Sequence, residues 1–115
     1  MPPGLRQGRN YYHAGDLNPS SVATDWFNTW GYNLLGEHRE KDALAVFQLN
    51  AWAHPNIANL QDSLADGLSA VEDKGLAREA VERAIELVPR DLSIDSPSAK
   101  SAFLIEEKAK LQQLK

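Results

Sequence analysis

The 115-residue sequence contains no cysteine, a single methionine and no run of 18 apolar residues. Without cysteine the chain cannot form a disulfide framework or a thiolate metal site. A membrane-spanning helix needs about 20 consecutive apolar residues, so the sequence predicts none. The first residues, Met1 to Gly4, lack the charged and then apolar pattern of a signal peptide. We therefore expect a cytoplasmic location by default.

Positive charge is also scarce, because 12 Lys and Arg stand against 16 Asp and Glu and give a formal net charge of -4. A nucleic-acid-binding protein shows a basic stripe, and an anionic membrane surface attracts polybasic segments. The acidic balance therefore argues against both partners. The composition of 43% hydrophobic and 24% charged residues is close to that of globular domains and argues against disorder over the whole chain.

The motifs of common catalytic sites are missing. The sequence has three scattered histidines (13, 38 and 54) but no His-x-x-x-His pair, no Gly-x-Ser-x-Gly elbow and no phosphate-binding glycine loop. Asp62 and Asp66 are one helical turn apart with Ser63 beside them, which is compatible with a cation site or an acid pair. The simpler interpretation is a solvated helix face. We expect no catalytic residue, no metal site and no cofactor, and therefore not an enzyme.

Apolar residues at three- and four-residue steps predict helices and no strands. Asn18-Pro19 and Ser96-Pro97 each combine an N-cap with a proline at the first helical position. Residues 1–18, with three glycines and two prolines, predict an irregular lead-in. The sequence therefore predicts an all-α domain over residues 19–115. The five expected helices span residues 19–36, 41–53, 57–71, 76–88 and 97–114, with Asn56 as the N-cap of the third.

The segment 24–57 recurs loosely as 58–91, at a constant stride of 34 residues and without a gap. A fixed period of this length is the sequence signature of stacked repeats. We therefore expect two helical repeats, 24–57 and 58–91, followed by a capping helix at 97–114. The matched pairs are Trp30 and Leu64, Gly31 and Ala65, Leu34 and Leu68, Ala43 and Ala77, Phe47 and Val81, and Pro55 and Pro89.

These two units resemble tetratricopeptide repeats, which place small residues where paired helices approach and large apolar residues between pairs. The resemblance implies a right-handed stack of antiparallel helix pairs. Asn50 and Gln61 depart from the family pattern, and the glycine expected in each turn is displaced. The residues that carry the resemblance are Phe27, Trp30, Gly31, Leu34, Ala43, Phe47 and Pro55 in the first unit, and Leu64, Ala65, Leu68, Ala77, Val81, Ala84 and Pro89 in the second.

Stacked repeats present binding surfaces more often than catalytic centres. In the tetratricopeptide family the first helix of each pair lines a concave groove, and the register implies a polar, acidic groove with no lysine. We therefore expect a basic or neutral peptide as its ligand rather than an acidic C-terminal tail. The groove residues implied by the register are Asp25, Asn28, Tyr32, Leu35, Asn59, Asp62, Ser63, Asp66 and Ser69.

The expected second helix, residues 41–53, is apolar on nearly all sides, and such a helix is normally covered. Leu49 and Trp52 stand where the repeat usually carries charge, and two repeats are fewer than the three usually needed. A second copy of the chain, paired around a twofold axis, is the favoured cover. We expect Trp26 and Trp30 to pack in the core. The other candidates are an upstream domain and the lead-in, with Leu5, Tyr11 and Tyr12.

Three phrases also resemble repeat modules at the C-termini of some bacterial serine hydrolases and esterases: Gly31-Tyr32, residues 47–50 and residues 58–64. That resemblance implies an alternative function, as an accessory or lid module that acts only with a catalytic domain. The main expectation is a non-catalytic protein–protein interaction or self-assembly module. It would bind a peptide or protein segment in the groove and associate as a homodimer through Leu49 and Trp52.

Overall fold

The computed structural model describes the backbone of residues 19–115 and the side chains from residue 22 onward. The expected lead-in, including Leu5, Tyr11 and Tyr12, lies outside the described residues. Within the described range the chain forms helices only, which confirms the all-α prediction. The elements are α2 (Pro19–Gly36), α3 (Glu40–Ala53), α4 (Ala58–Ala70), α5 (Lys74–Leu87), the short 3-10 helix η1 (Val88–Arg90) and α6 (Pro97–Gln113).

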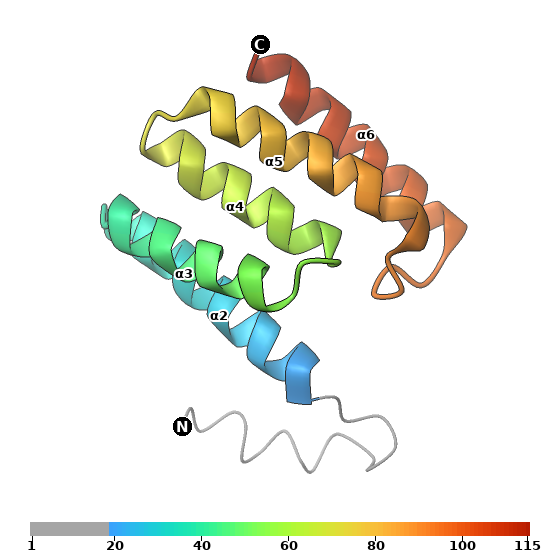
Figure 1. Ribbon diagram of the computed structural model, residues 1–115, viewed down its shortest axis with the longest axis horizontal. Helices are drawn as coiled ribbons and strands as arrows, with labels where there is room; N and C mark the ends of the chain where they lie inside the picture. Colours follow the sequence, from blue (N-terminus) through green and yellow to red (C-terminus); the bar gives the residue numbers. More distant parts are fainter. Residues whose placement is uncertain (1–18) are drawn as a thin grey trace.

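The helices lie side by side in chain order, each packed against the next, and α2 also touches α4 (Figure 1). A core of buried apolar side chains runs between α2, α3, α4 and α5. The last helix closes one end of this row, because Phe103 and Leu104 pack against buried Leu87 and Val88. At the opposite end α2 has its main contacts with α3 and α4 only.

The ring of Phe47 of α3 lies where α2, α3 and α4 come close together. A Cβ atom added to Gly31 of α2 would lie 2.3 Å from the Phe47 ring, and one added to Gly67 of α4 would lie 2.8 Å from it. Neither position therefore accepts a larger residue without movement of the ring. The small residue expected at Gly31 is explained by this contact.

The helix starts follow local side-chain hydrogen bonds. Ser96 Oγ accepts the amide of Ala99 at 3.1 Å, so α6 begins at Pro97 as predicted. The Asp73 side chain accepts the amide of Leu76, so α5 begins at Lys74, two residues before the predicted start.

The predicted N-cap of α4, Asn56, is wrong. The helix begins at Ala58, and the amide of Ala58 donates to Asp91 Oδ2 at 2.7 Å. Asp91 is buried and also accepts hydrogen bonds from the amide and hydroxyl of Ser93. The start of α4 is thus capped by a residue 33 positions away in the chain, which no local sequence pattern reveals.

The turns after α2 and α4 have the same geometry 34 positions apart. In each turn an amide donates to a carbonyl five positions back, Leu34 O in the first and Leu68 O in the second, at 2.9 Å in both. This is the Schellman motif, which requires one left-handed residue. His38 and Glu72 take that position with φ of 62° and 64°. The turn position at which the repeat pattern expects glycine is therefore occupied by a strained non-glycine residue in both turns.

We expect Glu72→Gly to raise the free energy of unfolding by about 1 kcal/mol, because glycine carries no Cβ penalty at positive φ. Urea denaturation followed by circular dichroism measures it as a higher midpoint at unchanged slope. Glu79→Gly, on the exposed face of α5, is the matched control and should lower stability by about 1 kcal/mol. If both substitutions changed the free energy of unfolding in the same direction, the backbone of Glu72 would not be strained.

Candidate functional site

Side chains from α2, α4 and α6 meet in one polar cluster. The Tyr32 hydroxyl donates to Asp66 Oδ2 at 2.6 Å and lies 3.2 Å from Ser63 Oγ. Lys110 Nζ donates to Asp66 Oδ1 at 2.8 Å and to Asp62 Oδ1. The Asp66 carboxylate thus joins the first described helix to the last.

Glu107 lies one turn before Lys110 on α6 and is only 2% exposed. Its Oε1 has no hydrogen-bond partner. Burial and a hydrogen bond shared with Asp62 raise the pKa of Glu107 to about 8. This shift favours the protonated form of Glu107 at neutral pH, and in that form the Glu107–Asp62 pair carries a single negative charge.

The remaining charges of the cluster are held in place by the same carboxylates. Burial alone would lower the pKa of Lys110, but hydrogen bonds to Asp62 and Asp66 outweigh it and raise that pKa. Burial and the hydrogen bond to Asp66 raise the pKa of Tyr32. At neutral pH two aspartates face one ammonium group, which leaves one net negative charge.

A hollow of about 370 Å³ lies two helical turns from this cluster. Asp25 of α2, Asn59 of α4 and Phe103 of α6 border it, and each is seven residues before Tyr32, Asp66 or Lys110 on its own helix. The hollow and the cluster therefore share one surface, which we name the α2–α4–α6 strip. The residues that line the hollow are Thr24, Asp25, Ile57, Asn59, Leu60, Ser93, Ile94 and Phe103.

The structure brings together most of the residues implied for the groove. Tyr32, Asp62, Ser63 and Asp66 form the cluster, while Asp25 and Asn59 line the hollow. Asn28, one turn before Tyr32, has a buried Oδ1 atom without a hydrogen-bond partner.

Two of the implied groove residues lie apart from the cluster and the hollow. Leu35 packs against the core residues Leu34 and Phe47. Ser69, near the end of α4, offers its carbonyl oxygen to the turn amide of Glu72. Neither side chain is among those that form the cluster or line the hollow.

The interpretation of Asp62 and Asp66 as a solvated helix face is wrong, because both bind Lys110 and are partly buried. Their partner lies 48 and 44 residues further along the chain. Sequence reasoning missed Lys110, Glu107 and Phe103, and the only signal for them is their common spacing on the last helix. The absence of lysine from the groove thus holds for α2 and α4 but not for α6.

The expected core position of Trp26 and Trp30 is also wrong. The two side chains are 42% and 43% exposed, and their rings lie 5.7 Å apart. Phe27 packs against both rings. The other described helices therefore leave both indole side chains substantially uncovered.

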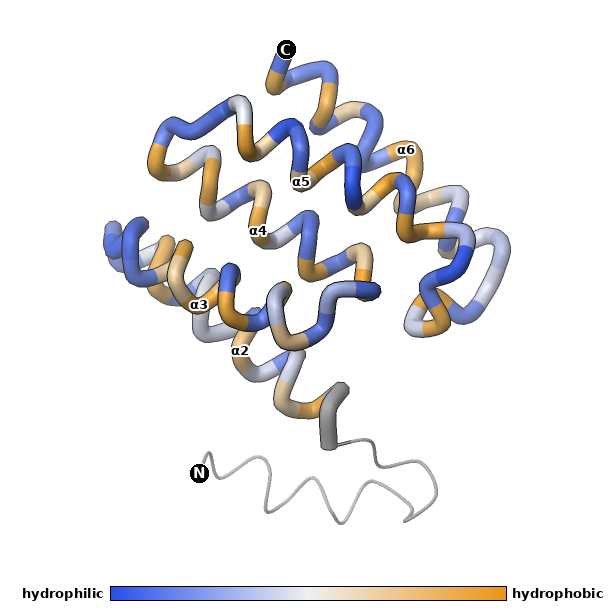
Figure 2. Tube along the Cα trace, viewed as in Figure 1, coloured by the Kyte–Doolittle hydropathy of each residue, from blue (hydrophilic) through white to orange (hydrophobic). Residues whose placement is uncertain are grey.

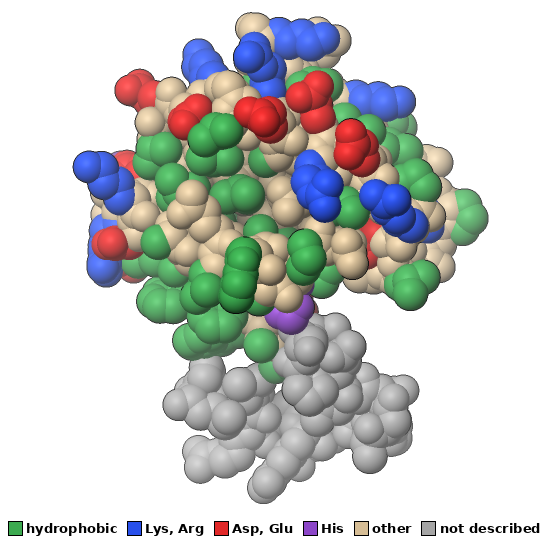
Figure 3. Space-filling view, in the orientation of Figure 1, with side chains coloured by type: hydrophobic (Ala, Val, Ile, Leu, Met, Phe, Trp, Pro, Cys, Tyr) green, Lys and Arg blue, Asp and Glu red, His purple; other side chains and the backbone are tan. Residues whose placement is uncertain are grey.

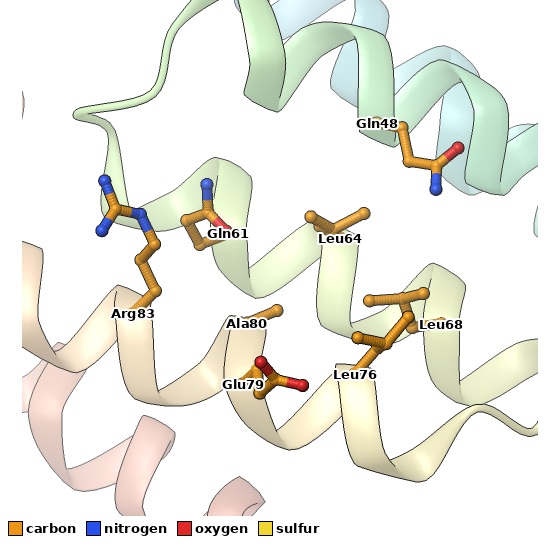
Figure 4. Close-up of a pocket in the computed structure, with 8 residues that line it drawn as sticks. All are labelled: Gln48, Gln61, Leu64, Leu68, Leu76, Glu79, Ala80 and Arg83. Atoms are coloured by element: carbon orange, nitrogen blue, oxygen red, sulfur yellow. The ribbon is translucent and has the colours of Figure 1, made fainter.

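A second hollow, of about 260 Å³, lies between α3, α4 and α5 (Figure 4). Leu64, Leu68 and Leu76 come close together in its middle, and Gln48 of α3 faces them. None of the residues expected to bind a ligand lines it. Its volume is below the range of about 300–1,000 Å³ that is typical of small-molecule sites.

Neither a metal site nor a membrane span is found in the part of the chain that the structure describes. No three His, Asp or Glu side chains among these residues are placed to hold a metal ion. None of the described helices combines the length and the apolar character that crossing a bilayer requires.

Comparison with known proteins gave no match to a family model, to a curated protein or to a solved structure. The likeness to tetratricopeptide repeats therefore depends on the residues themselves and on the equal turns at His38 and Glu72. The function has to be inferred from the chemistry of the α2–α4–α6 strip.

Proposed function

We propose that the chain is a non-catalytic peptide- or protein-binding module of the tetratricopeptide type, which holds a ligand segment along the α2–α4–α6 strip. The observation that carries the proposal is the alignment of three helices, which place a hollow and a polar cluster two turns apart on one surface. The equal turns at His38 and Glu72, 34 residues apart, support the repeat architecture.

The lining of the hollow predicts that the ligand inserts an apolar side chain into it. Ile57, Leu60, Ile94 and Phe103 provide apolar surface within it, and polar groups of Asp25 and Asn59 stand beside them. Most small recognition sites combine an apolar lining with a few polar groups in this way. A leucine- or phenylalanine-sized side chain suits its volume of about 370 Å³.

The polar groups of the strip specify the flanking part of the ligand. Asn28 Oδ1 is an acceptor without a donor, and a buried acceptor gains most from a new hydrogen bond. A peptide N–H group would supply that bond once the Asn28 side chain turns to expose Oδ1. The cluster carries one net negative charge and Asp25 adds another at the hollow, so a basic or neutral segment matches the strip better than an acidic tail.

The proposal is tested by titrating capped peptides that share a central leucine or phenylalanine and differ in flanking charge. We expect micromolar affinity for the lysine-flanked peptide and about tenfold weaker binding of the glutamate-flanked one, a difference of ~1.4 kcal/mol. The difference should shrink as salt is added, because Asp25 is exposed.

Asp25→Lys should weaken binding of the lysine-flanked peptide by about tenfold. Glu86→Lys is the matched control, because it makes the same charge change on the exposed face of α5, away from the strip. Equal affinity for the two peptides, or an equal loss in both variants, would rule out the strip as the binding surface.

A further inference from the structure

One flank of the domain is an apolar surface that no described helix covers. The α2–α3 flank, as we name it, consists of Trp26, Phe27, Trp30, Val46, Leu49 and Trp52. Four of the eight large apolar side chains exposed in the described range belong to it, with Leu49 56% and Trp52 80% exposed. In Figure 3 hydrophobic side chains gather over α2 and α3, whereas charged ones concentrate over α5 and α6 and at the turns.

The two helices present this flank as a unit. Asn50 Nδ2 of α3 donates to Thr24 O of α2 at 3.1 Å, which fixes the second half of α3 beside the first half of α2. The half of α3 that carries Leu49 and Trp52 therefore lies beside the half of α2 that carries Trp26. The continuous apolar surface is larger than the single exposed side chains that are normal on a monomer.

The residues 34 positions later in the chain, which occupy the equivalent places of the second repeat, are covered by a neighbouring helix pair. Leu60, 34 residues after Trp26, is 2% exposed, while Trp26 is 42% exposed. Leu64, 34 residues after Trp30, packs against Leu34 and Phe47 of the preceding helix pair. The α2–α3 flank thus has the composition of an inner stacking face but stands at the end of the row. Terminal units of helical stacks normally carry a polar outer face.

The low charge of the flank suits pairing with an identical surface. Only one residue of α2, Asp25, is charged, and it borders the hollow on the strip. The charged residues of α3, Glu40, Lys41 and Asp42, all stand in its first turn, and Arg39 pairs with Asp42 at 2.9 Å. A twofold axis brings identical surfaces together, so like charges would oppose one another. This flank has almost none to oppose, whereas strongly hydrophilic and apolar residues alternate along α5 (Figure 2), and its exposed positions include Arg78, Glu79, Glu82, Arg83 and Glu86.

We propose that a second copy of the chain packs its own α2–α3 flank against this one around a twofold axis. Each copy then supplies the neighbour that the first helix pair of the other lacks, and both apolar flanks are buried in one step. The strip lies on a different side of α2 and stays open. The dimer would present two strips, so a ligand with two binding segments would gain avidity.

Sedimentation equilibrium of the full chain from low to high micromolar concentration tests the proposal. We expect a mass that rises towards twice the 12.7 kDa of the monomer. Trp30→Lys and Leu49→Lys should each weaken self-association by at least about tenfold, because each places two ammonium groups across the axis. Circular dichroism should show unchanged helix content, since both side chains are substantially exposed.

Leu92→Lys and Ile105→Lys are the controls, because these side chains are 94% and 70% exposed outside the flank. Their self-association should equal that of the unaltered chain. A monomeric mass at high micromolar concentration would overturn the proposal, and so would a dimer that the flank variants leave intact. Peptide affinity per chain should be unchanged in Leu49→Lys, so this proposal and the peptide-binding one fail independently.

Discussion

We expect Phe47→Ala to lower the free energy of unfolding by about 4 kcal/mol, in the middle of the range for buried phenylalanines. The ring is buried where α2, α3 and α4 meet, and Tyr32 packs edge-on against it at 5.0 Å between centroids. Gly31 and Gly67 line the space on two sides and have no side chains that can move in to fill it. A domain of this size has only about 5–15 kcal/mol in total, so much of its stability would be lost.

Urea unfolding measures this loss, with Leu76→Ala, at a half-exposed side chain of α5, as a control expected to change stability by less than about 1 kcal/mol. A double-mutant cycle identifies the cause. Gly31→Ala should destabilise the unaltered chain by about 1–3 kcal/mol, because the new methyl group meets the ring. In the Phe47→Ala background the same change should stabilise, because the methyl group has room and alanine favours the helix by about 1 kcal/mol. The same sign in both backgrounds would contradict the packing seen here.

The helices were predictable because their signals are local. Ser96 caps α6 by accepting a hydrogen bond from the amide three residues later. In α2 the apolar residues recur at helical spacing over its whole length. The start of α4 was not predictable, since Asp91 reaches it from another part of the chain. A non-glycine residue at the left-handed turn position, such as Glu72, is likewise invisible to a pattern that looks for glycine.

Some features of the candidate site were likewise predictable from the sequence, and others were not. Register on α2 and α4 predicted that Tyr32, Ser63 and Asp66 share a surface, and they do. Sequence reasoning treated Asp66 as solvated because its partner Lys110 depends on how α6 packs. Trp30 was misplaced for a related reason, since its spacing shows an apolar face but not whether a neighbouring element covers that face.

We expect Glu107→Gln to stabilise the protein by about 4 kcal/mol at pH 8 and to have little effect near pH 4. Burial and the hydrogen bond with Asp62 raise the pKa of Glu107 from 4.5 to about 8 in the folded state. Below pH 4.5 both the folded and the unfolded chain hold the proton, and the full stability is present. As the pH rises from 4.5 to about 8, only the unfolded chain releases it, so stability is progressively lost.

Glutamine keeps the shape of the protonated acid and does not titrate, which removes this loss. The groups facing Glu107 are Asp62 and Asp66 of α4 and Lys110 of its own helix, and all three are kept in the variant. The difference in unfolding free energy between Glu107→Gln and the unaltered chain should therefore grow with pH and level off above about 8. On the scale of a domain this size it corresponds to a difference in Tm on the order of 10 °C.

The matched control is Glu106→Gln, which makes the same change at the exposed neighbouring position of α6. Its stability should stay within about 0.5 kcal/mol of the unaltered chain at every pH. Parallel pH profiles for Glu107→Gln and the unaltered chain would mean that Glu107 is ionised in the folded protein. The cluster would then carry two net negative charges at neutral pH, and α6 would have to hold a buried carboxylate against Asp62. A profile that diverges as the pH rises, by contrast, assigns the proton to the Glu107–Asp62 pair and makes α6 most firmly docked in mild acid.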